Sequence, residues 1–542
     1  MKITSVGHAG FFIETRYGSV LADPWFNPAY FASWIPFPSN RDLDLEKISN
    51  PDYLYVSHLH RDHFDEEFLK NHVSKETQVI LPDYPLDLME REYRRLGFTN
   101  FVRTQNNTPM TLESGLRIMV PALTAPTDGP LGDSGLCVDD GETRLFDQND
   151  SRPIDLEPLE DFGPFDVHLL QFSGAIWYPM VYELPGKAKD ALGKQKRANQ
   201  LARALRYVKQ IGATHIIPSA GPPMFLDDDL FYLNDFDNHE SNIFPDQTVF
   251  IEYLEEHGVE NGHLLIPGSR ATVNRDNCSL THPVTDDEVR RIFSDKRGYL
   301  EELREIWRPE LDAEKASWPR GEVEILPALK AWFEPLLAQA DLNCVGVNGR
   351  VLFDLGEADQ DKGREEILID FQGRTVGPYN GEKWDYRFRM DPALVEYCIV
   401  NGEKDWINTL FLSCRFSAKR KGAYNEYVYN FFKVLDEERL AFSEEYYAQS
   451  APVRQLWECG NFMVQRQCPH LKADLTRFGE EEDGILTCTL HGWQFDLQTG
   501  ECLTSDGAKL FTQPKEEYEK NVEKSGVGTA SATVNGGGPP SF

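Results

Sequence analysis

The 542-residue chain lacks any uninterrupted run of about eighteen apolar residues, the length that a membrane-spanning helix needs. Its sequence starts with a strand-like segment rather than with the apolar stretch of a signal peptide. Cations are scarce as well: 55 Lys and Arg stand against 88 Asp and Glu, a formal net charge of −33. The electric field of so negative a chain repels polyphosphates and anionic lipid surfaces. We therefore expect a cytoplasmic protein with neither a nucleic-acid nor a membrane partner.

Cysteine is also sparse, with nine in the whole chain. So few cysteines in so long a chain do not form a disulfide framework, and they predict free thiols or metal ligands instead. We expect buried thiols at Cys137, Cys278, Cys344, Cys398 and Cys414. Apolar material, in contrast, is plentiful: 41% of the residues are hydrophobic and 12% aromatic, which at this length predicts two to four globular domains.

The most informative segment is the string HLHRDH at residues 58–63, which follows the apolar run 53–56. A strand that ends in three histidines and an aspartate brings several nitrogen and oxygen donors to one loop, as transition metals require and a packed core does not. The string therefore predicts a metal site with His58, His60, His63 and Asp62 as ligands. A chance histidine cluster on a solvated loop is the competing interpretation.

Two carboxylates near this loop are candidate catalytic groups. Asp23 follows the strand-like run 20–22, and a carboxylate at a strand end near metal ligands commonly orients an imidazole. Asp62 lies within the string itself. His8, in the turn 7–10, is either a pocket group or a histidine that is hydrogen-bonded within that turn.

Later strand ends offer further donors. The predicted strand 144–146 leads into four residues with side-chain oxygen donors, and strand alternation favours Asn149 or Asp150 as a metal ligand, with Asp147 as an alternative. A polar turn without metal is the competing interpretation. His239 could close the site from a late loop, although a lone histidine among acids is more often a surface residue.

Strand-like runs and helical patterns alternate over residues 1–275, which predicts an α/β sandwich whose loops at one sheet end carry the chemistry. Within this region, residues 187–211 show the pattern of a helix with an apolar stripe and many cations elsewhere. These cations either receive a phosphate or a partner or, more commonly, form a solvated face. Residues 276–440 change to helices, among them one helix over 286–308, around short strands, which predicts an α+β middle domain.

A second metal motif lies near the C-terminus, where the strings CPH (468–470) and CTLH (488–491) are separated by 17 residues. Two thiolates and two imidazoles from two loops define a Rieske [2Fe–2S] centre, with Cys468 and Cys488 on one iron and His470 and His491 on the other. Tetrahedral zinc is the alternative. We place a small all-β Rieske domain at residues 441–515 and a disordered tail at 516–542.

The two motifs together carry the functional hypothesis. A Rieske cluster transfers one electron at a time and leaves no free position for a substrate. Its presence on one chain with a histidine-rich site implies that the second metal is redox-active, since zinc could make no use of the electron. Non-haem iron(II) on histidines and a carboxylate would leave positions for O₂ and substrate, which predicts hydroxylation.

Several segments resemble a known family: His8-Ala9, Asp23-Pro24-Trp25, residues 57–63, Asp150-Ser151-Arg152-Pro153, Phe172-Ser173-Gly174, the basic helix 187–211, Ala220-Gly221 and the aromatic block 424–432. With the Rieske motif, they make the chain similar to the CMP-N-acetylneuraminate hydroxylase family, whose other domain has the metallo-β-lactamase fold. The resemblance implies an αββα sandwich and electrons from NAD(P)H through cytochrome b5, ferredoxin or a reductase.

The chain departs from this pattern in two respects. Its Rieske motif comes last rather than first, so a nucleotide-sugar is only one candidate among small polar substrates. Residues 124–133 also lack the histidine that dinuclear hydrolases of this fold supply, which leaves room for a single metal.

We therefore predict a Rieske-type iron monooxygenase that uses O₂ and hydroxylates a small polar substrate, such as a nucleotide-sugar or an amino-containing metabolite. One alternative is a zinc hydrolase of the metallo-β-lactamase class with a regulatory Rieske domain, and another is a redox or electron-transfer protein. Whether electrons pass within one chain or between chains of a homo-oligomer stays open.

Overall fold

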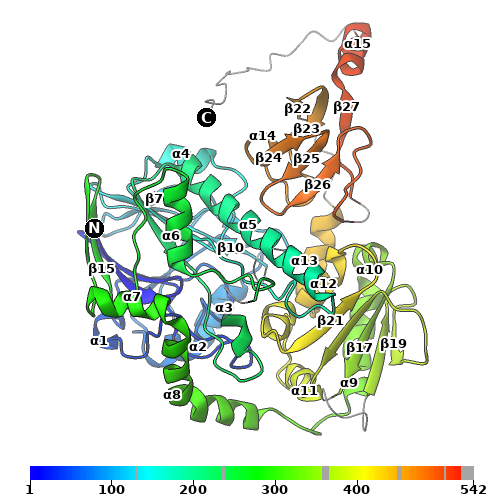
Figure 1. Ribbon diagram of the computed structural model, residues 1–542, viewed down its shortest axis with the longest axis horizontal. Helices are drawn as coiled ribbons and strands as arrows, with labels where there is room; N and C mark the ends of the chain where they lie inside the picture. The colour runs from blue at the N-terminus through cyan, green and yellow to red at the C-terminus, as the bar shows by residue number, and fades with distance from the viewer. Residues whose placement is uncertain are drawn as a thin grey trace. The chain divides into compact units, whose positions relative to one another are not determined.

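The computed structural model describes residues 1–127, 129, 131–234, 239–356, 365–448, 455–505 and 508–525. The chain divides into two compact units, Met1–Ser450 and Ala451–Phe542 (Figure 1). Across the part of the chain that is described, no helix combines the length and the apolar character needed to cross a membrane.

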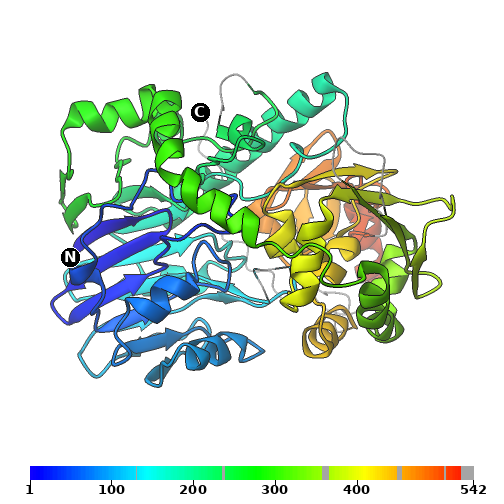
Figure 2. The ribbon, with the colours of Figure 1, turned by 90° about the horizontal axis from the view of Figure 1, so that it is seen from below.

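Two facing β-sheets form the N-terminal part of the first unit (Figure 2). In one sheet the strand order is β16-β15-β1-β2-β3-β4-β5-β6, and in the other it is β14-β13-β12-β11-β8-β7. The first sheet contains β1 (Lys2–Gly7), β2 (Gly10–Thr15), β3 (Gly18–Ala22), β4 (Tyr53–Tyr55), β5 (Gln78–Leu81), β6 (Phe101–Arg103), β15 (Arg270–Asn274) and β16 (Asn277–Thr281). The second contains β7 (Met110–Thr111), β8 (Arg117–Met119), β11 (Leu136–Asp139), β12 (Arg144–Asn149), β13 (Val167–Gln171) and β14 (His215–Ser219).

The sandwich forms because apolar side chains alternate along these strands and fill the space between the sheets. Ile3, Ile13 and Val20 of the first sheet share one core with Ile118 and Val167 of the second. Helices contact both sheets: α2 (Glu66–Asn71) and α3 (Leu88–Arg95) share a core with the first sheet, while α5 (Gly186–Ile211) and α6 (Gln247–Glu256) contact β13 and β14 of the second. This arrangement confirms the predicted αββα sandwich, although β16 extends it beyond the expected boundary at residue 275.

The remainder of the first unit is built on a sheet of order β19-β18-β17-β20-β21. Its strands are β17 (Arg350–Leu355), β18 (Glu365–Asp370), β19 (Thr375–Pro378), β20 (Tyr386–Met390) and β21 (Phe416–Arg420), and the helices of this region are α9 (Ile325–Gln339), α10 (Asp341–Val347), α11 (Pro392–Val400), α12 (Glu426–Lys433) and α13 (Glu437–Ala448). It shares a core with the sandwich region, where Trp177 and Tyr182 pack with Phe411 and Tyr429. The predicted single helix over 286–308 is instead two helices, α7 (Asp286–Ser294) and α8 (Lys296–Ser317).

The second unit contains two three-stranded sheets, of order β22-β23-β27 and β24-β25-β26. Their bounds are β22 (Leu456–Cys459), β23 (Phe462–Gln465), β24 (Gly479–Glu482), β25 (Ile485–Cys488), β26 (Trp493–Asp496) and β27 (Thr512–Pro514). The predicted disordered tail is wrong in its first part, because helix-forming Glu and Lys residues build α15 over Lys515–Ser525. The rest of that tail, from residue 526, lies outside the described residues.

Candidate metal centres

The HLHRDH loop follows β4 and is fixed by backbone and capping hydrogen bonds. The amides of His63 and Phe64 both donate to the carbonyl of His60, which turns the loop back on itself. Asp65 then caps α2 by accepting from the amide of Phe68, and it also accepts from the amide of Phe26. The loop therefore has a defined shape before any ion is considered.

The loop and its neighbours supply two adjoining sets of metal donors. His58, His60 and Asp150 form one set, and His8, Asp62 and His63 form the other; within each set the donor atoms lie within 4.8 Å of one another. The sets meet where Nε2 of His63 lies 3.6 Å from Oδ1 of Asp150. The sequence analysis expected room for a single metal, but the turn between β1 and β2 brings in the imidazole of His8 as a further nitrogen donor.

Three groups around these sets position the imidazoles. Asp23 accepts from the amide of Ser57 at 2.7 Å, and its other oxygen lies 3.3 Å from Nδ1 of His63. The hydroxyl of Ser57 lies 2.9 Å and a carboxylate oxygen of Asp133 3.3 Å from Nδ1 of His58. Contacts of this kind fix the ring orientation of a metal-binding histidine. Asp133 was not among the predicted site residues, because it lies far from His58 in the sequence and no local pattern links the two.

The charges of the buried groups also indicate a cation site. Burial lowers the pKa of His63, but the carboxylates of Asp150, Asp23 and Asp62 outweigh it and raise that pKa well above its usual value. Asp147 has both carboxylate oxygens buried without a hydrogen-bond partner in the described structure. Burial, followed by the charge of Asp23, raises its pKa well above the usual range. So many buried carboxylates require positive charge, which metal ions or a protonated histidine supply.

Two predicted ligands are not among these donor sets. Asn149, in a left-handed conformation with φ 42°, donates its side-chain amide to the carbonyl of Ser134. Strand alternation favoured Asn149 and Asp150 equally; the carboxylate of Asp150 lies with His58 and His60, whereas the side-chain oxygen of Asn149 accepts from the amide of Asp150. His239 is exposed, with its ring against Tyr232, and takes no part in either set.

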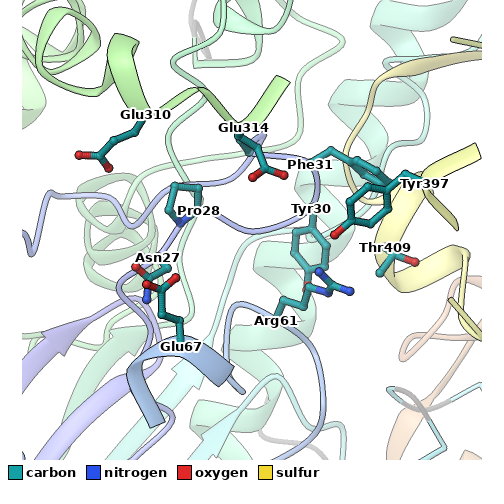
Figure 3. A pocket seen from close by; sticks show the side chains of 11 residues that line it. Asn27, Pro28, Tyr30, Phe31, Arg61, Glu67, Glu310, Glu314, Tyr397 and Thr409 are labelled. Atoms are coloured by element: carbon teal, nitrogen blue, oxygen red, sulfur yellow. The ribbon is translucent and has the colours of Figure 1, made fainter. Parts of the chain in front are cut away.

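A pocket of about 380 Å³ adjoins the second donor set (Figure 3). Tyr30 and Arg61 lie in its wall, and the hydroxyl of Tyr30 donates to Asp62 at 2.5 Å. Tyr30, Phe31 and Ala32 all have left-handed backbones, with φ of 53°, 58° and 53°. Glu310 and Tyr397 also line this polar pocket, so the sandwich and the following region both contribute residues to it.

A cluster of three half-buried cations lies beside the first donor set. Arg152 lies two residues beyond Asp150, and Lys196 and Arg203 are seven residues apart on one face of α5. Tyr207, one turn further along this face, donates its hydroxyl to the carbonyl of Pro153 at 2.9 Å and so holds the helix against the segment that carries Asp150.

Each side chain of this cation cluster makes the charged form of its neighbours less favourable. Burial, together with the charges of Arg203 and Arg152, lowers the pKa of Lys196 to about 7. Burial and Arg152 lower the pKa of Arg203 to about 9. An anion bound among the three would relieve this repulsion.

In the second unit, four predicted ligands come together from two loops. Cys468 and Cys488 are buried, and a hydrogen bond between their thiols lowers the pKa of Cys488 to about 7. The rings of His470 and His491 lie 4.9 Å apart and perpendicular, with both Nδ1 atoms buried, and His470 stacks on Trp493 at 4.1 Å. Two facing thiols and two facing imidazoles fit a [2Fe–2S] cluster of the Rieske kind.

Three family models match separate parts of the chain: a beta-lactamase superfamily domain over residues 2–118, an Rv3818-like, SCP2-like domain over 325–449 and a Rieske [2Fe-2S] domain over 433–513. The chain is thus a protein with a metallo-β-lactamase-fold domain and a C-terminal Rieske domain. The sequence analysis described the region of the SCP2-like match only as α+β.

Full-length relatives define the family. The chain is 50% identical over 521 residues, 95% of its length and 100% of the relative, to a protein of Mycolicibacterium smegmatis named as a Rieske 2Fe-2S iron-sulfur protein. It is 47% identical over 518 residues, 94% of its length and 99% of the relative, to the Mycobacterium tuberculosis protein Rv3818, which carries the same name. It belongs to this family of Rieske 2Fe-2S iron-sulfur proteins.

Among solved structures, the chain is similar to CmlA, a diiron β-hydroxylase from Streptomyces venezuelae. The identity is 20% and the TM-score 0.34, and the likeness covers 50% of this chain and 54% of CmlA.

Proposed function

We propose that the protein is a Rieske-dependent iron monooxygenase that hydroxylates a small polar substrate with O₂. One observation carries this proposal: a Cys₂His₂ set that fits an electron-carrying cluster and two histidine–carboxylate sets that fit a different metal occur on one chain. Iron at the N-terminal sets would supply O₂ activation, and the cluster would supply single electrons. An electron carrier has no purpose beside a purely hydrolytic zinc site, which favours iron.

The donor count supports two ions at the N-terminal centre rather than one. Each set contains two imidazoles and one carboxylate, the ligand types that iron accepts with open positions left over. In this role Asp23 and Ser57 would hold His63 and His58 in orientation, and Tyr30 would hold Asp62 through its 2.5 Å hydrogen bond. We therefore expect about four iron per chain when the two cluster irons are included.

The surroundings of the centre suggest the chemistry of the substrate. The pocket beside Asp62 is lined by charged and hydroxyl-bearing groups, which suits a polar molecule. On the other side, the cluster of Arg152, Lys196 and Arg203 would bind a carboxylate or phosphate group of the substrate. A nucleotide-sugar or an amino acid-like metabolite has such a group.

Electrons would reach the cluster from a ferredoxin, a cytochrome b5 or a reductase, and ultimately from NAD(P)H. In a chain with a net charge of −33, a donor would dock through a cationic face.

The test is a single turnover of the holoprotein, reduced anaerobically with dithionite and then exposed to O₂. We expect the EPR signal of the reduced cluster to disappear as O₂ is consumed. His58→Ala should lose iron without losing sulfide and should slow this reoxidation at least tenfold. His239→Ala, which changes an exposed histidine outside both donor sets, is the matched control and should behave as the unmodified chain does.

A hydrolase of the beta-lactamase superfamily would give the opposite result. The N-terminal centre would then hold about two zinc, hydrolytic activity would be indifferent to O₂, and the reduced cluster would reoxidise at the same rate in His58→Ala. That outcome would overturn the monooxygenase proposal.

A further inference from the structure

A third group of metal-ligand side chains lies away from both centres described above. His215, His263 and Cys278 each offer one donor atom, and these atoms all lie within 4.8 Å of one another. His215 is the first residue of β14, whereas the other end of this strand leads to Ala220, whose amide donates to the carbonyl of His8. A strand of five residues spans about 13 Å, so the group is at the opposite end of the sandwich from the N-terminal metal donors.

Three separate segments build the group, and together they join the two sheets. β14, which carries His215, is the edge strand of one sheet, and β16, which carries Cys278, is the edge strand of the other. His263 belongs to a segment that runs alongside β14, because the amide of Ile216 donates to the carbonyl of Asn261 and the amide of His263 donates to the carbonyl of Ile216. The group therefore lies where the outer edges of the two sheets meet.

The distances suit ligands of one ion. Nδ1 of His215 lies 3.1 Å from Nε2 of His263, close to the separation of about 3.3 Å between two nitrogens bound to a tetrahedral zinc with bonds of about 2.0 Å. His215 is 7% exposed, and its Nδ1 is the ring nitrogen that faces His263. His263 and Cys278 are half-buried, which leaves a path for an ion from solvent.

The charge state of His263 suits such a ligand set as well. Burial and the neighbouring His215 lower the pKa of His263, so this imidazole is neutral, the form that binds metal. Burial raises the pKa of Cys278 and keeps its thiol protonated while the site is empty, so an ion has to displace this proton in order to bind.

We propose that His215, His263 and Cys278 form a site for a zinc-class divalent cation that joins the β14 edge of one sheet to the β16 edge of the other. Two imidazoles and one thiolate are the ligands that zinc prefers, and water would complete its fourth position. The site is independent of the proposed oxygenase chemistry, since no residue is shared with the N-terminal donor sets or with the cluster ligands.

The test uses Co²⁺ as a spectroscopic substitute for zinc in the holoprotein with its cluster intact. A thiolate-to-cobalt charge-transfer band should grow to one equivalent and should be displaced by Zn²⁺. It should be absent in Cys278→Ser and retained in Cys502→Ser, a control at another half-buried cysteine. The N-terminal donor sets contain no thiol, so cobalt bound there does not contribute to the band.

A second variant tests whether the two histidines bind an ion or only hydrogen-bond to each other. It also keeps the proposal testable if Cys278→Ser fails to fold. His263→Gln keeps the thiol and should weaken Co²⁺ binding at least tenfold. A chain that shows no charge-transfer band, or one whose band is unchanged by either substitution, would overturn the proposal, and the two histidines would then be joined by a hydrogen bond alone.

Discussion

His168 shows how a single buried side chain makes the sandwich sensitive to acid. It lies in β13, stacked on Phe146, with its Nε2 2.9 Å from the side-chain oxygen of Gln148. Burial lowers its pKa to about 3, whereas histidine in an unfolded chain titrates near 6.5. Between these values the unfolded chain binds a proton that the folded chain does not. The stability that His168 contributes is therefore complete above pH 6.5 and is lost as the pH falls towards 3.

We expect His168→Phe to reduce this sensitivity. At pH 7.5 the variant should be about 1 kcal/mol less stable, because the hydrogen bond to Gln148 is lost. The loss of unfolding free energy between pH 7.5 and pH 5.5 should be smaller than that of the unmodified chain by about 1.4 kcal/mol. Urea unfolding at the two pH values measures both quantities, and an equal loss in the two proteins would contradict the assignment.

At this scale the sequence predicts ligands that are close together in the chain. His58, His60, Asp62 and His63 are recognisable because one loop carries them all. His8 was predicted only as a pocket group or a turn histidine, and Asp133 was not predicted at all, because they reach the centre through the pairing of β1 with β2 and the contact of Asp133 with His58, which the spacing of residues does not contain.

Helix α5 shows, for a whole element, the same contrast between what a local pattern predicts and what depends on contacts with distant residues. Its apolar stripe predicted the helix within one residue of its observed start, and the stripe supplies the buried Leu201, Leu205 and Val208. Its cations were expected either to receive a phosphate or a partner or, more commonly, to form a solvated face, and Lys194 fits the second description, since it pairs with Glu240 in solvent. Lys196 and Arg203 instead face Arg152, because Tyr207 fixes the rotation of the helix on the sheet.

The cation cluster on α5 makes a prediction at the scale of this helix. Lys196→Met should raise the free energy of unfolding in chloride buffer by about 0.5 kcal/mol, since it removes repulsion among partly exposed like charges. Phosphate should raise the unfolding temperature of the unmodified chain more than that of the variant, because the variant has lost one phosphate contact. Lys194→Met is the control at an exposed position of the same helix. If phosphate raised the unfolding temperature of the unmodified chain and of Lys196→Met by the same amount, an anion site at Lys196 would be excluded.

One helix was predicted over 286–308, whereas the structure has helix α7 and helix α8. Asp295 separates them: its amide donates to the carbonyl of Arg291 at the end of α7, and its side chain accepts from the amide of Gly298 at the start of α8. A capping residue acts through local backbone geometry, which a general helical pattern does not reveal.

For the first unit as a whole, the sequence indicated separate domains, whereas the structure joins the sandwich to the region that follows it. Arg415 of that region donates to a carboxylate oxygen of Asp227 at 2.9 Å and to the carbonyl of Phe31 at 3.1 Å. Lys315 lies 3.0 Å from the same carboxylate, and the Asp227 side chain is 2% exposed. The partners are 88 and 188 residues apart from Asp227, so no local pattern reveals their contact.

Asp227→Asn should therefore destabilise the unit strongly. The substitution leaves the guanidinium of Arg415, 9% exposed, without its counter-charge, which costs about 3 kcal/mol. Arg291→Met, which breaks an exposed pair with Glu302, should cost less than 1 kcal/mol. Denaturant unfolding measures the loss of unfolding free energy in each variant. Equal losses would show that the buried pair stabilises the unit no more than the exposed pair does.

The left-handed run at Tyr30, Phe31 and Ala32 makes one side chain of the candidate metal centre depend on a distant part of the chain. Each of these residues adopts a conformation that is unfavourable by about 1 kcal/mol, so the run persists only while its surroundings enforce it. Phe31 packs edge-on against Trp318 and Tyr397, which both lie beyond the sandwich in sequence. Tyr30, which precedes Phe31 and donates to Asp62, is thus anchored from outside the sandwich, so a sandwich produced without those later segments would lose the fixed position of this hydroxyl.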